Sequence, residues 1–306
     1  MQKMEIKQDV PGGKAALHWL PLAAAAAGHA IWGVSYLFSR VALQIAEPSV
    51  VLSLRFWIAV ALMSLMILMK KASVSFKGKK WKPLALLAAT ELACFYFESY
   101  GILYTNATFA GVVSAVSPVV AIVMAAVFLR EFPSRRQSLF CILPVAGVII
   151  MTVSGSSLGV VQPLGVVCLI CSCVSSAAYK TANRKSSEEF TVFERTYIVL
   201  VTCAIVFTLS ALRSVGGDMR MYFSPLADPK FLGSVLVLGV FSSVGANMLI
   251  NYGAARLPVV KLSSFGSLTT LCSMFAGIVF LREPAAGGIF LGAALILVGI
   301  RQVTKP

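Results

Sequence analysis

The stretch Phe128-Leu129-Arg130-Glu131 reads FLRE, and the same four letters recur as Phe280-Leu281-Arg282-Glu283. The copies lie 152 residues apart in a chain of 306 residues, so each falls at the same place in one half of the sequence. The same offset relates Tyr100-Gly101 to Tyr252-Gly253 and Gly147 to Gly299. Similarity that keeps one offset over several positions indicates an internal repeat. We therefore predict two related halves, residues 1–156 and 157–306.

Composition places both halves in a membrane. Hydrophobic residues make up 58% of the chain and charged residues 12%, against about 25% charged in a typical soluble domain. A helix needs about 20 apolar residues to cross the bilayer core, and ten such runs occur. They are Leu22 to Val41, Val50 to Met69, Pro83 to Tyr104, Ala107 to Leu129, Ser138 to Val153, Pro163 to Thr181, Val192 to Leu212, Phe231 to Gly253, Val259 to Leu281 and Ile289 to Val303. The predicted fold is an all-α integral membrane protein with ten transmembrane helices.

The basic residues predict how the chain is oriented. With a cytoplasmic N-terminus, 20 of the 26 Lys and Arg residues fall on the cytoplasmic side and five outside, while Arg55 lies within a span. Cytoplasmic loops carry such an excess. We expect a multi-pass protein of the bacterial plasma (inner) membrane with both termini in the cytoplasm. The net charge of +14 then faces anionic lipid, and no nucleic-acid partner is expected. The first apolar run continues to Phe38, which is longer than a signal-peptide core, so we predict a span there.

An odd number of spans per half makes the second half enter the membrane from the opposite side. The repeats are therefore predicted to be inverted, with Glu131 at the cytoplasmic face and Glu283 at the outer face. Inverted repeats are typical of transporters that work by alternating access. A simpler interpretation of FLRE is that its Arg and Glu only end a helix at the membrane interface.

These features resemble the EamA branch of the drug/metabolite transporter superfamily over nearly the whole chain. The resemblance rests on the five-plus-five arrangement, the helix-ending Leu-Arg-Glu in both halves, and three further stretches: Leu54-Arg55-Phe56, Glu98 to Pro118, and Glu194-Arg195-Thr196-Tyr197. It implies a secondary transporter, often an exporter of small metabolites. It also implies a central cavity lined by the third, fourth, eighth and ninth helices together with the first and sixth. The halves differ at Pro118, because Thr270 stands at the corresponding place.

Glu98 is the leading candidate for substrate binding or coupling, because a charge inside the bilayer costs at least about 2.5 kcal/mol on insertion scales. Glu91 and Phe95 share its helical face, and Tyr100 belongs to an aromatic neighbourhood around it. Aromatic rings beside a carboxylate suit an organic cation. Alternatively, Glu98 carries a coupling proton, because burial favours the neutral carboxyl group. A structural pair with Arg55 is the third interpretation. Glu91 is expected to be structural.

Other polar and aromatic residues in the spans complete the predicted site. Pro118 removes a helical hydrogen bond at mid-membrane and exposes a carbonyl group beside Ser117. The remaining candidates are Ser267, Thr270, Trp32, Tyr36, Tyr179, Asn247 and Asn251. For the hydroxyl and amide groups, the alternative is that they only link neighbouring helices. For the rings, it is packing or anchoring at the membrane interface.

The motifs of known enzyme classes give no support for catalysis. The chain has no GxSxG, no HExxH and no GxxxxGK[ST] sequence. We therefore expect neither an enzyme nor a cofactor or metal site, although a membrane enzyme or a channel stays the rival. The expected partners are the lipid bilayer and a small amphipathic substrate such as an amino acid or organic amine, with a proton as the candidate coupling ion. The oligomeric state is left open.

Overall fold

The computed structural model describes residues 19–75, 78–114, 116–117, 119–120, 139–140, 142–157, 161–257, 262, 265–284 and 287–303. Within these ranges the regular elements are all helices. The first FLRE copy, with Glu131, lies outside them, and so does Pro118. The expectation of an all-α chain holds for every element in the described part.

The helices follow the predicted apolar runs closely. Those of the first half are α1 (Leu20–Leu43), α2 (Pro48–Leu68), α3 (Lys82–Tyr104), α4 (Ala107–Ser114) and α7 (Ile142–Ser157). Those of the second half are α8 (Pro163–Ser186), α9 (Val192–Ser214), α10 (Met219–Phe223), η2 (Ser224–Ala227), α11 (Pro229–Val237), η3 (Leu238–Ala246), α12 (Asn247–Ala254), α14 (Gly266–Phe280) and α15 (Gly287–Val303). Proline in the first turn begins α1, α2, α3 and α11, where its missing N–H costs no hydrogen bond.

Six helices of the described residues are long and apolar enough to cross a membrane. They are α1, α2, α3, α8, α9 and the continuous helix Pro229–Ala254 formed by α11, η3 and α12. Three of the other predicted spans appear as shorter apolar helices in α7, α14 and α15. The remaining one is represented by α4, which is described only as far as Ser114. The protein is thus a multi-pass helical membrane protein, and within the described residues six of the ten predicted spans are long and apolar enough to cross a membrane.

The eighth predicted span is not a uniform α-helix. Its middle, η3, is a π-helix of nine residues between α11 and α12. A π-helical segment changes the direction of the side chains that follow it, and such segments often occur at functional sites. Gly239 in η3 faces α2, where a Cβ atom would lie 2.8 Å from the backbone oxygen of Arg55. Glycine is therefore needed for η3 to approach α2 this closely.

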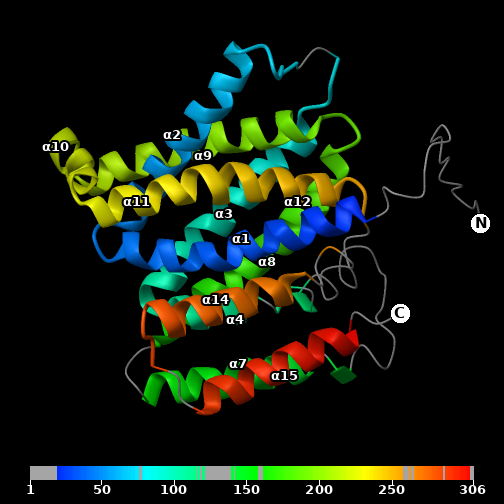
Figure 1. Cartoon of the computed structure of the whole chain (residues 1–306), viewed down its shortest axis with the longest axis vertical. Helices are drawn as coiled ribbons and strands as arrows, with labels where there is room; N and C mark the ends of the chain where they lie inside the picture. The colour runs from blue at the N-terminus through cyan, green and yellow to red at the C-terminus, as the bar shows by residue number, and fades with distance from the viewer. Residues whose placement is uncertain are drawn as a thin grey trace, which may run out of the picture.

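The contacts between helices follow the pattern that two related halves would produce (Figure 1). The second helices of the two halves, α2 and α9, pack together at one edge of the molecule, and the fifth helices, α7 and α15, pack together at the other. The fourth helices, α4 and α14, also pair. The first helix, α1, packs against α11, η3 and α12, while α3 packs against α8. A two-fold axis that exchanges the halves turns the pairing of α1 with α11, η3 and α12 into the pairing of α8 with α3. It leaves the pairings of the second, fourth and fifth helices unchanged.

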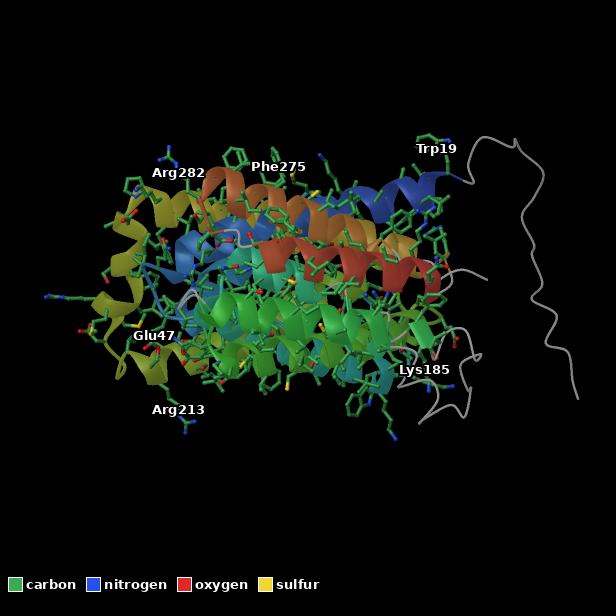
Figure 2. All side chains as sticks on the ribbon, turned by 90° about the horizontal axis from the view of Figure 1, so that it is seen from below. Trp19, Glu47, Lys185, Arg213, Phe275 and Arg282 are labelled. Carbon is green, nitrogen blue, oxygen red and sulfur yellow. The ribbon has the colours of Figure 1, made fainter. Side chains whose placement is uncertain are left out.

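Equivalent helices of the two halves run in opposite directions. Trp19, just before α1, lies at the same end of the molecule as Lys185, which is close to the C-terminal end of α8 (Figure 2). Glu47, Arg213 and Arg282 lie at the other end. Because α1 starts where α8 finishes, the first helices of the halves are antiparallel, as inverted repeats require. The basic residues Lys185 and Arg213 also lie at opposite ends, as the predicted topology expects.

The distribution of polarity suits lipid as the solvent. Leu68, Val153, Phe275 and Phe280 are among many large apolar side chains that are exposed, and Phe275 points away from the bundle in Figure 2. Several charged and amide side chains, among them Arg55, Glu91, Lys180 and Asn251, are in contrast buried between the helices. A soluble protein rarely exposes apolar patches of this extent, whereas in a bilayer the polar side chains face the interior. The described helices therefore enclose a polar centre within an apolar surface.

Candidate functional site

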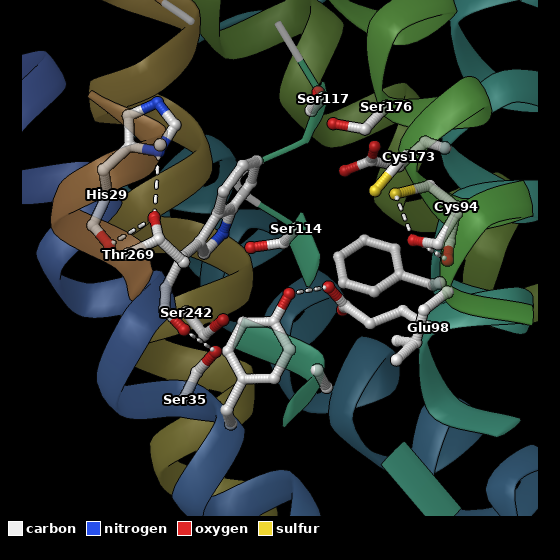
Figure 3. Close-up of a pocket in the computed structure, with 18 of the residues that line it drawn as sticks. His29, Ser35, Cys94, Glu98, Ser114, Ser117, Cys173, Ser176, Ser242 and Thr269 are labelled. Carbon is white, nitrogen blue, oxygen red and sulfur yellow. Dashed lines mark hydrogen bonds between the residues drawn. The ribbon is translucent and has the colours of Figure 1, made fainter. Parts of the chain in front are cut away.

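A pocket at the centre of the bundle is lined by residues of α1, α3, α4, α8, η3 and α14 (Figure 3). These are the first, third, fourth, sixth, eighth and ninth spans of the prediction, which are the six helices implied by the family resemblance. The lining residues are His29, Trp32, Ser35, Tyr36, Glu91, Cys94, Phe95, Glu98, Ala110, Ser114, Ser117, Leu169, Ser172, Cys173, Ser176, Lys180, Ser242, Gly266 and Thr269. Both halves of the chain thus contribute to one polar pocket.

Glu98 lies in this pocket and is hydrogen-bonded across it. The hydroxyl group of Tyr36 on α1 donates a 2.6 Å hydrogen bond to Oε1 of Glu98 on α3 (Figure 3). Glu91 and Phe95 line the pocket from the same helix. Their spacings of seven and three residues from Glu98 place all three side chains on one face of α3. The structure therefore brings together the carboxylates, Phe95 and Tyr36 that the sequence identified separately.

Arg55 does not form the ion pair with Glu98 that was one interpretation of the sequence. Its buried guanidinium group donates hydrogen bonds to Ser243 Oγ at 3.1 Å and Ser242 Oγ at 3.2 Å, both on η3. It also lies over the rings of Phe56 and Phe95, at 5.2 and 4.9 Å from their centroids. Among the described residues the ion pair within 4.0 Å is Lys79 with Glu194, away from the pocket. The π-helix and the aromatic rings stabilise Arg55, and Glu98 stays available to the pocket.

Several buried polar atoms of the pocket have no hydrogen-bond partner within the described chain. Five buried side-chain atoms of the described residues have no hydrogen-bond partner. Three of them belong to pocket residues: His29 Nε2, Trp32 Nε1 and Glu91 Oε1. Buried polar groups in native proteins are nearly always hydrogen-bonded, so each exception needs an explanation. Both donors and acceptors are among the three, which suits a polar ligand or water.

His29 is held against the second half of the chain. Its Nδ1 lies 3.1 Å from Oγ1 of Thr269 on α14, and this hydroxyl group also donates to the backbone oxygen of His29 at 3.0 Å. One turn further along α1, a Cβ atom at Gly33 would lie 2.6 Å from the backbone oxygen of Thr269. The glycine thus allows α1 and α14 to approach, and His29 is oriented with Nε2 unpaired.

Lys180 requires a correction to the sequence interpretation, in which it counted among the cytoplasmic basic residues. It is 4% exposed, lines the pocket from α8, and donates a 3.2 Å hydrogen bond to Ser117 Oγ. The prediction ended the sixth span at Thr181, whereas α8 continues to Ser186. The longer helix places Lys180 a full turn inside the bundle. Ser117 is thereby tied to a charged partner.

Of the twelve predicted site residues, five line the pocket: Trp32, Tyr36, Phe95, Glu98 and Ser117. Tyr100 does not. It is half-buried on another face of α3, where its ring centroid lies 4.8 Å from that of Tyr96 and 6.2 Å from that of Tyr104. Three tyrosines spaced by four residues form a stripe along the helix, and Tyr96 is exposed. This stripe lies outside the pocket.

Tyr179 and Asn251 belong to a separate buried network. Tyr179 donates a 2.8 Å hydrogen bond to Asn251 Oδ1, and Asn251 Nδ2 donates to Thr196 Oγ1 at 2.7 Å. Arg195, which is fully buried, donates to the backbone oxygens of Asn183 at 2.8 Å and Asn251 at 3.2 Å, and also to Asn183 Oδ1. The network joins α8, α9 and α12. Asn251 thus makes the helix-linking contacts that were its alternative, whereas the alternative for Tyr179 was packing or anchoring at the membrane interface.

Thr270 and Asn247 also lie outside the pocket lining. Thr270 Oγ1 donates to the backbone oxygen of Gly111 at 3.0 Å and so joins α14 to α4. Asn247 Nδ2 donates to the backbone oxygen of Ser243 at 3.0 Å within the helix that contains η3. The side chain of Ser267 lies outside the described part of the chain, as Pro118 does. The backbone N–H of Val116 donates to the backbone oxygen of Val113 at 2.9 Å. This bond joins residues three apart, so the turn after α4 is tighter than an α-helical turn.

Sequence reasoning did not select the residues by which α8 lines the pocket, although the family resemblance implied that the sixth helix contributes. Leu169, Ser172, Cys173, Ser176 and Lys180 all line the pocket, and their spacing of three or four residues is that of one helical face. The signal was a polar stripe ending in a lysine within an apolar span. His29 and Thr269 were also not selected, because a single histidine or threonine in a span carries no pattern of its own.

The second half contains a hydrogen bond of the same kind as the one between Tyr36 and Glu98. Tyr36 belongs to the first helix of its half and Glu98 to the third, and Tyr179 and Asn251 belong to the corresponding helices of the second half. In each half a tyrosine thus donates to an oxygen of the third helix. The first half has an ionisable acceptor that faces the pocket, and the second has a neutral amide in a closed network.

Known proteins resemble this chain in sequence or in fold. The model of the EamA-like transporter family matches twice, over residues 19–153 and 163–304. A protein of Bacillus subtilis (strain 168) named "Uncharacterized transporter YcxC" is 35% identical over 274 residues, which cover 88% of each chain. A protein of Archaeoglobus fulgidus named "Uncharacterized transporter" is 25% identical over 281 residues, or 90% of this chain and 95% of that one. A solved crystal structure superimposes with a TM-score of 0.65 at 17% identity, over 92% of this chain and 96% of the other, which is a likeness of fold.

The two family matches account for nearly all of the described helices. The relatives over the whole length are named transporters. This chain belongs to the EamA-like transporter family.

Proposed function

We propose that this protein is a secondary active transporter that moves a small amphipathic metabolite carrying an amine, such as an amino acid or an organic amine, out of the cytoplasm by alternating access. One observation carries the proposal: His29, Trp32 and Glu91 line one pocket between the two halves, and each has a buried polar atom without a hydrogen-bond partner in the described chain. A substrate that supplies the missing partners would bind there in preference to the surrounding apolar surface.

The chemistry of the α3 side of the pocket suits a positively charged nitrogen. Glu98 keeps one oxygen beyond its bond to Tyr36, and Glu91 Oε1 has no hydrogen-bond partner within the described chain. Phe95 and Trp32 line the same pocket. Carboxylates attract an ammonium group by charge, and aromatic rings add the attraction of their π faces. An apolar substituent on the amine would pack against the rings.

The arrangement of the halves suits alternating access. The pocket residues come from the helices that the two-fold relation exchanges, α1 with α8 and α3 with the helix containing η3. If the halves exchange conformations, the pocket opens to the opposite side while its lining stays the same. We place the protein in the bacterial inner membrane with both termini in the cytoplasm, on the basis of the excess of basic residues on that side.

Counterflow in proteoliposomes tests the proposal. Vesicles preloaded with amino acids, organic amines or nucleosides would be diluted into the labelled compound, and we expect saturable exchange for one class carrying an amine. Glu98→Gln should reduce the exchange of that class at least about tenfold if Glu98 binds the amine, since removal of a charged hydrogen-bond partner costs about 1.5–3 kcal/mol. Glu188→Gln, on the exposed surface after α8, is the matched control and should have no effect.

The same measurement separates proton coupling by Glu98 from substrate binding by Glu98. It also distinguishes a carrier from a channel and from a membrane enzyme. If Glu98 carries only a coupling proton, Glu98→Gln should keep exchange but lose uphill transport driven by a pH gradient. Flux that does not saturate would favour a channel. Chemical conversion of the compound would favour a membrane enzyme, and either result would contradict the proposal.

A further inference from the structure

Lys180 is a buried cation for which the described part of the chain provides no counter-charge. Its ammonium group has three N–H donors, and the hydrogen bond it makes in the described structure is the one to Ser117 Oγ at 3.2 Å. No carboxylate of the described residues lies within 4.0 Å of it. Lys79 shows the usual arrangement: it is 22% exposed and is held by both oxygens of Glu194 at 2.7 Å. Lys180 is far more buried, and its partner among the described residues is a neutral hydroxyl group.

Burial at this place makes the missing counter-charge costly. A lysine buried within a membrane helix is costly, and a buried charge is normally paired. The pocket has two carboxylates, but Glu98 accepts its hydrogen bond from Tyr36 and Glu91 has an oxygen without a partner. The pocket therefore keeps its negative and positive groups apart.

The surroundings of Lys180 are those of an oxyanion site. Ser176 precedes Lys180 by one turn of α8 and lines the pocket, and Ser117 contributes its hydroxyl group from the chain after α4. Figure 3 shows Ser117 and Ser176 in one region of the pocket and Glu98 with its bond to the Tyr36 hydroxyl in another, with Ser114 between them. Hydroxyl groups beside an ammonium group are donors suited to carboxylate oxygens.

We propose that Lys180 and Ser117 form an anion subsite that binds the carboxylate of the substrate while Glu98 binds its amine. The inference rests on the proposed function and narrows it. Of the two substrate classes, zwitterions with a carboxylate and an amine on a small apolar body are selected over simple amines. In the loaded pocket, Lys180 Nζ and the Ser117 hydroxyl group donate to the carboxylate, and each buried charge of the protein gains an opposite charge.

Pairs of probes that differ only in the carboxylate test this assignment. Leucine and 3-methylbutylamine form one pair, and phenylalanine and 2-phenylethylamine form another. Counterflow would be measured for each compound with the parent protein, Lys180→Met, Lys180→Arg and Lys185→Met. The last variant removes an exposed lysine from the same helix and is the matched control.

We expect the parent protein to exchange at least one amino acid with higher apparent affinity than its amine. Lys180→Met should lower the apparent affinity for the amino acid at least about 30-fold, as expected for the loss of one partner of a buried charge pair. The apparent affinity for the corresponding amine should change less than about threefold. Lys180→Arg should keep part of the preference because it keeps the charge, and Lys185→Met should match the parent. Retained exchange of the amine in Lys180→Met also shows that this variant folds.

Four results would overturn the assignment, and they can be told apart. Equal losses for both members of a pair would make Lys180 a structural residue. Amines that exchange as well as or better than their amino acids in the parent would contradict the anion subsite but leave the proposed transport function standing. Absence of saturable exchange for every probe would contradict the proposed function and this inference with it. A Lys180→Met protein that does not elute as a single species in detergent would identify an essential structural charge and also contradict the subsite.

Discussion

The carboxylate of Glu283, which ends the second FLRE, accepts a hydrogen bond from the backbone N–H of Ala107 at the start of α4 at 2.9 Å. Its other oxygen accepts from the N–H of Thr108 at 2.8 Å. The first N–H groups of a helix have no partner within the helix, and the helix dipole favours a negative charge there. A residue of the second half thus caps a helix of the first. Glu283 does more than end a helix, which was the simpler interpretation of FLRE.

Removal of this cap should destabilise the protein. Glu283→Ala leaves two N–H groups of α4 without their acceptor, and we expect a loss of about 1–2 kcal/mol in the free energy of unfolding. Thermal unfolding of the purified protein in detergent, followed by size-exclusion chromatography, measures the lower midpoint. Arg282→Ala, at the exposed neighbouring position, is the control. Equal midpoints for the two variants would show that the cap contributes nothing.

The close contact of α1 with α14 should depend on Gly33. A Cβ atom there would meet the backbone of Thr269, which a side-chain rotation cannot relieve. Gly33→Ala should therefore reduce stability by about 1–3 kcal/mol, as overpacking does. Gly233→Ala in α11 is the matched control, because nothing lies within 4 Å of its added Cβ atom. It should be neutral or raise stability by up to about 1 kcal/mol through helix propensity. A Gly33→Ala protein as stable as the control would mean that the helices separate freely.

Arg195 should act on stability and not on substrate affinity. Its guanidinium group donates from Nη1 to Asn183 and from Nη2 to Asn251, and a lysine cannot reach both in this geometry. Arg195→Lys should lower the free energy of unfolding by about 1.5–3 kcal/mol, while the apparent affinity in counterflow stays unchanged below the unfolding temperature. Arg301→Lys on exposed α15 controls for the substitution itself. Reduced affinity at an unchanged unfolding midpoint would place Arg195 in the transport site instead.

The two tyrosine hydrogen bonds should separate into a functional and a structural one. Tyr36→Phe removes the donor to Glu98 in the pocket, and we expect about a tenfold change in apparent affinity for amines with little change in stability. Tyr179→Phe removes the donor to Asn251 and should lower stability by about 1 kcal/mol with affinity unchanged. Counterflow and thermal unfolding on the same preparations make the comparison. The same response from both variants would refute the distinction.

Much of the fold could be read from the sequence because the bilayer imposes a simple rule. Each apolar run must be a helix long enough to satisfy its own backbone in lipid, so the helix positions and the repeat followed from composition and from the FLRE offset. The π-helix η3 did not follow, because its nine residues have the same apolar character as the α-helical turns around it. Helix ends were also imprecise, and this misplaced Lys180 as a cytoplasmic charge.

The pocket was predicted in part, and the residues that were found are those with a clear signal in the sequence. Glu98 was found from its charge within an apolar run, and Phe95 and Tyr36 from their spacing. Asn251 and Tyr179 carry an equally strong signal, yet they bond to each other and to the helices beside them. A sequence shows that a polar group is inside the bundle, but whether its partner is another helix or a ligand depends on distances that only folding sets.

The sequence by itself determined that this chain is a helical membrane protein of two related halves, because hydrophobicity and internal repetition are local properties of the chain. Only the tertiary structure decided which polar residues share one pocket. Lys180, Ser117 and Glu98 are brought to the same cavity by the packing of α8, the chain after α4, and α3. Arg195 and Asn251 are held apart from it in a network of their own. That choice depends on helix rotation and close contact between residues far apart in sequence, and a shift of a single residue in a helix turns a side chain by about 100°.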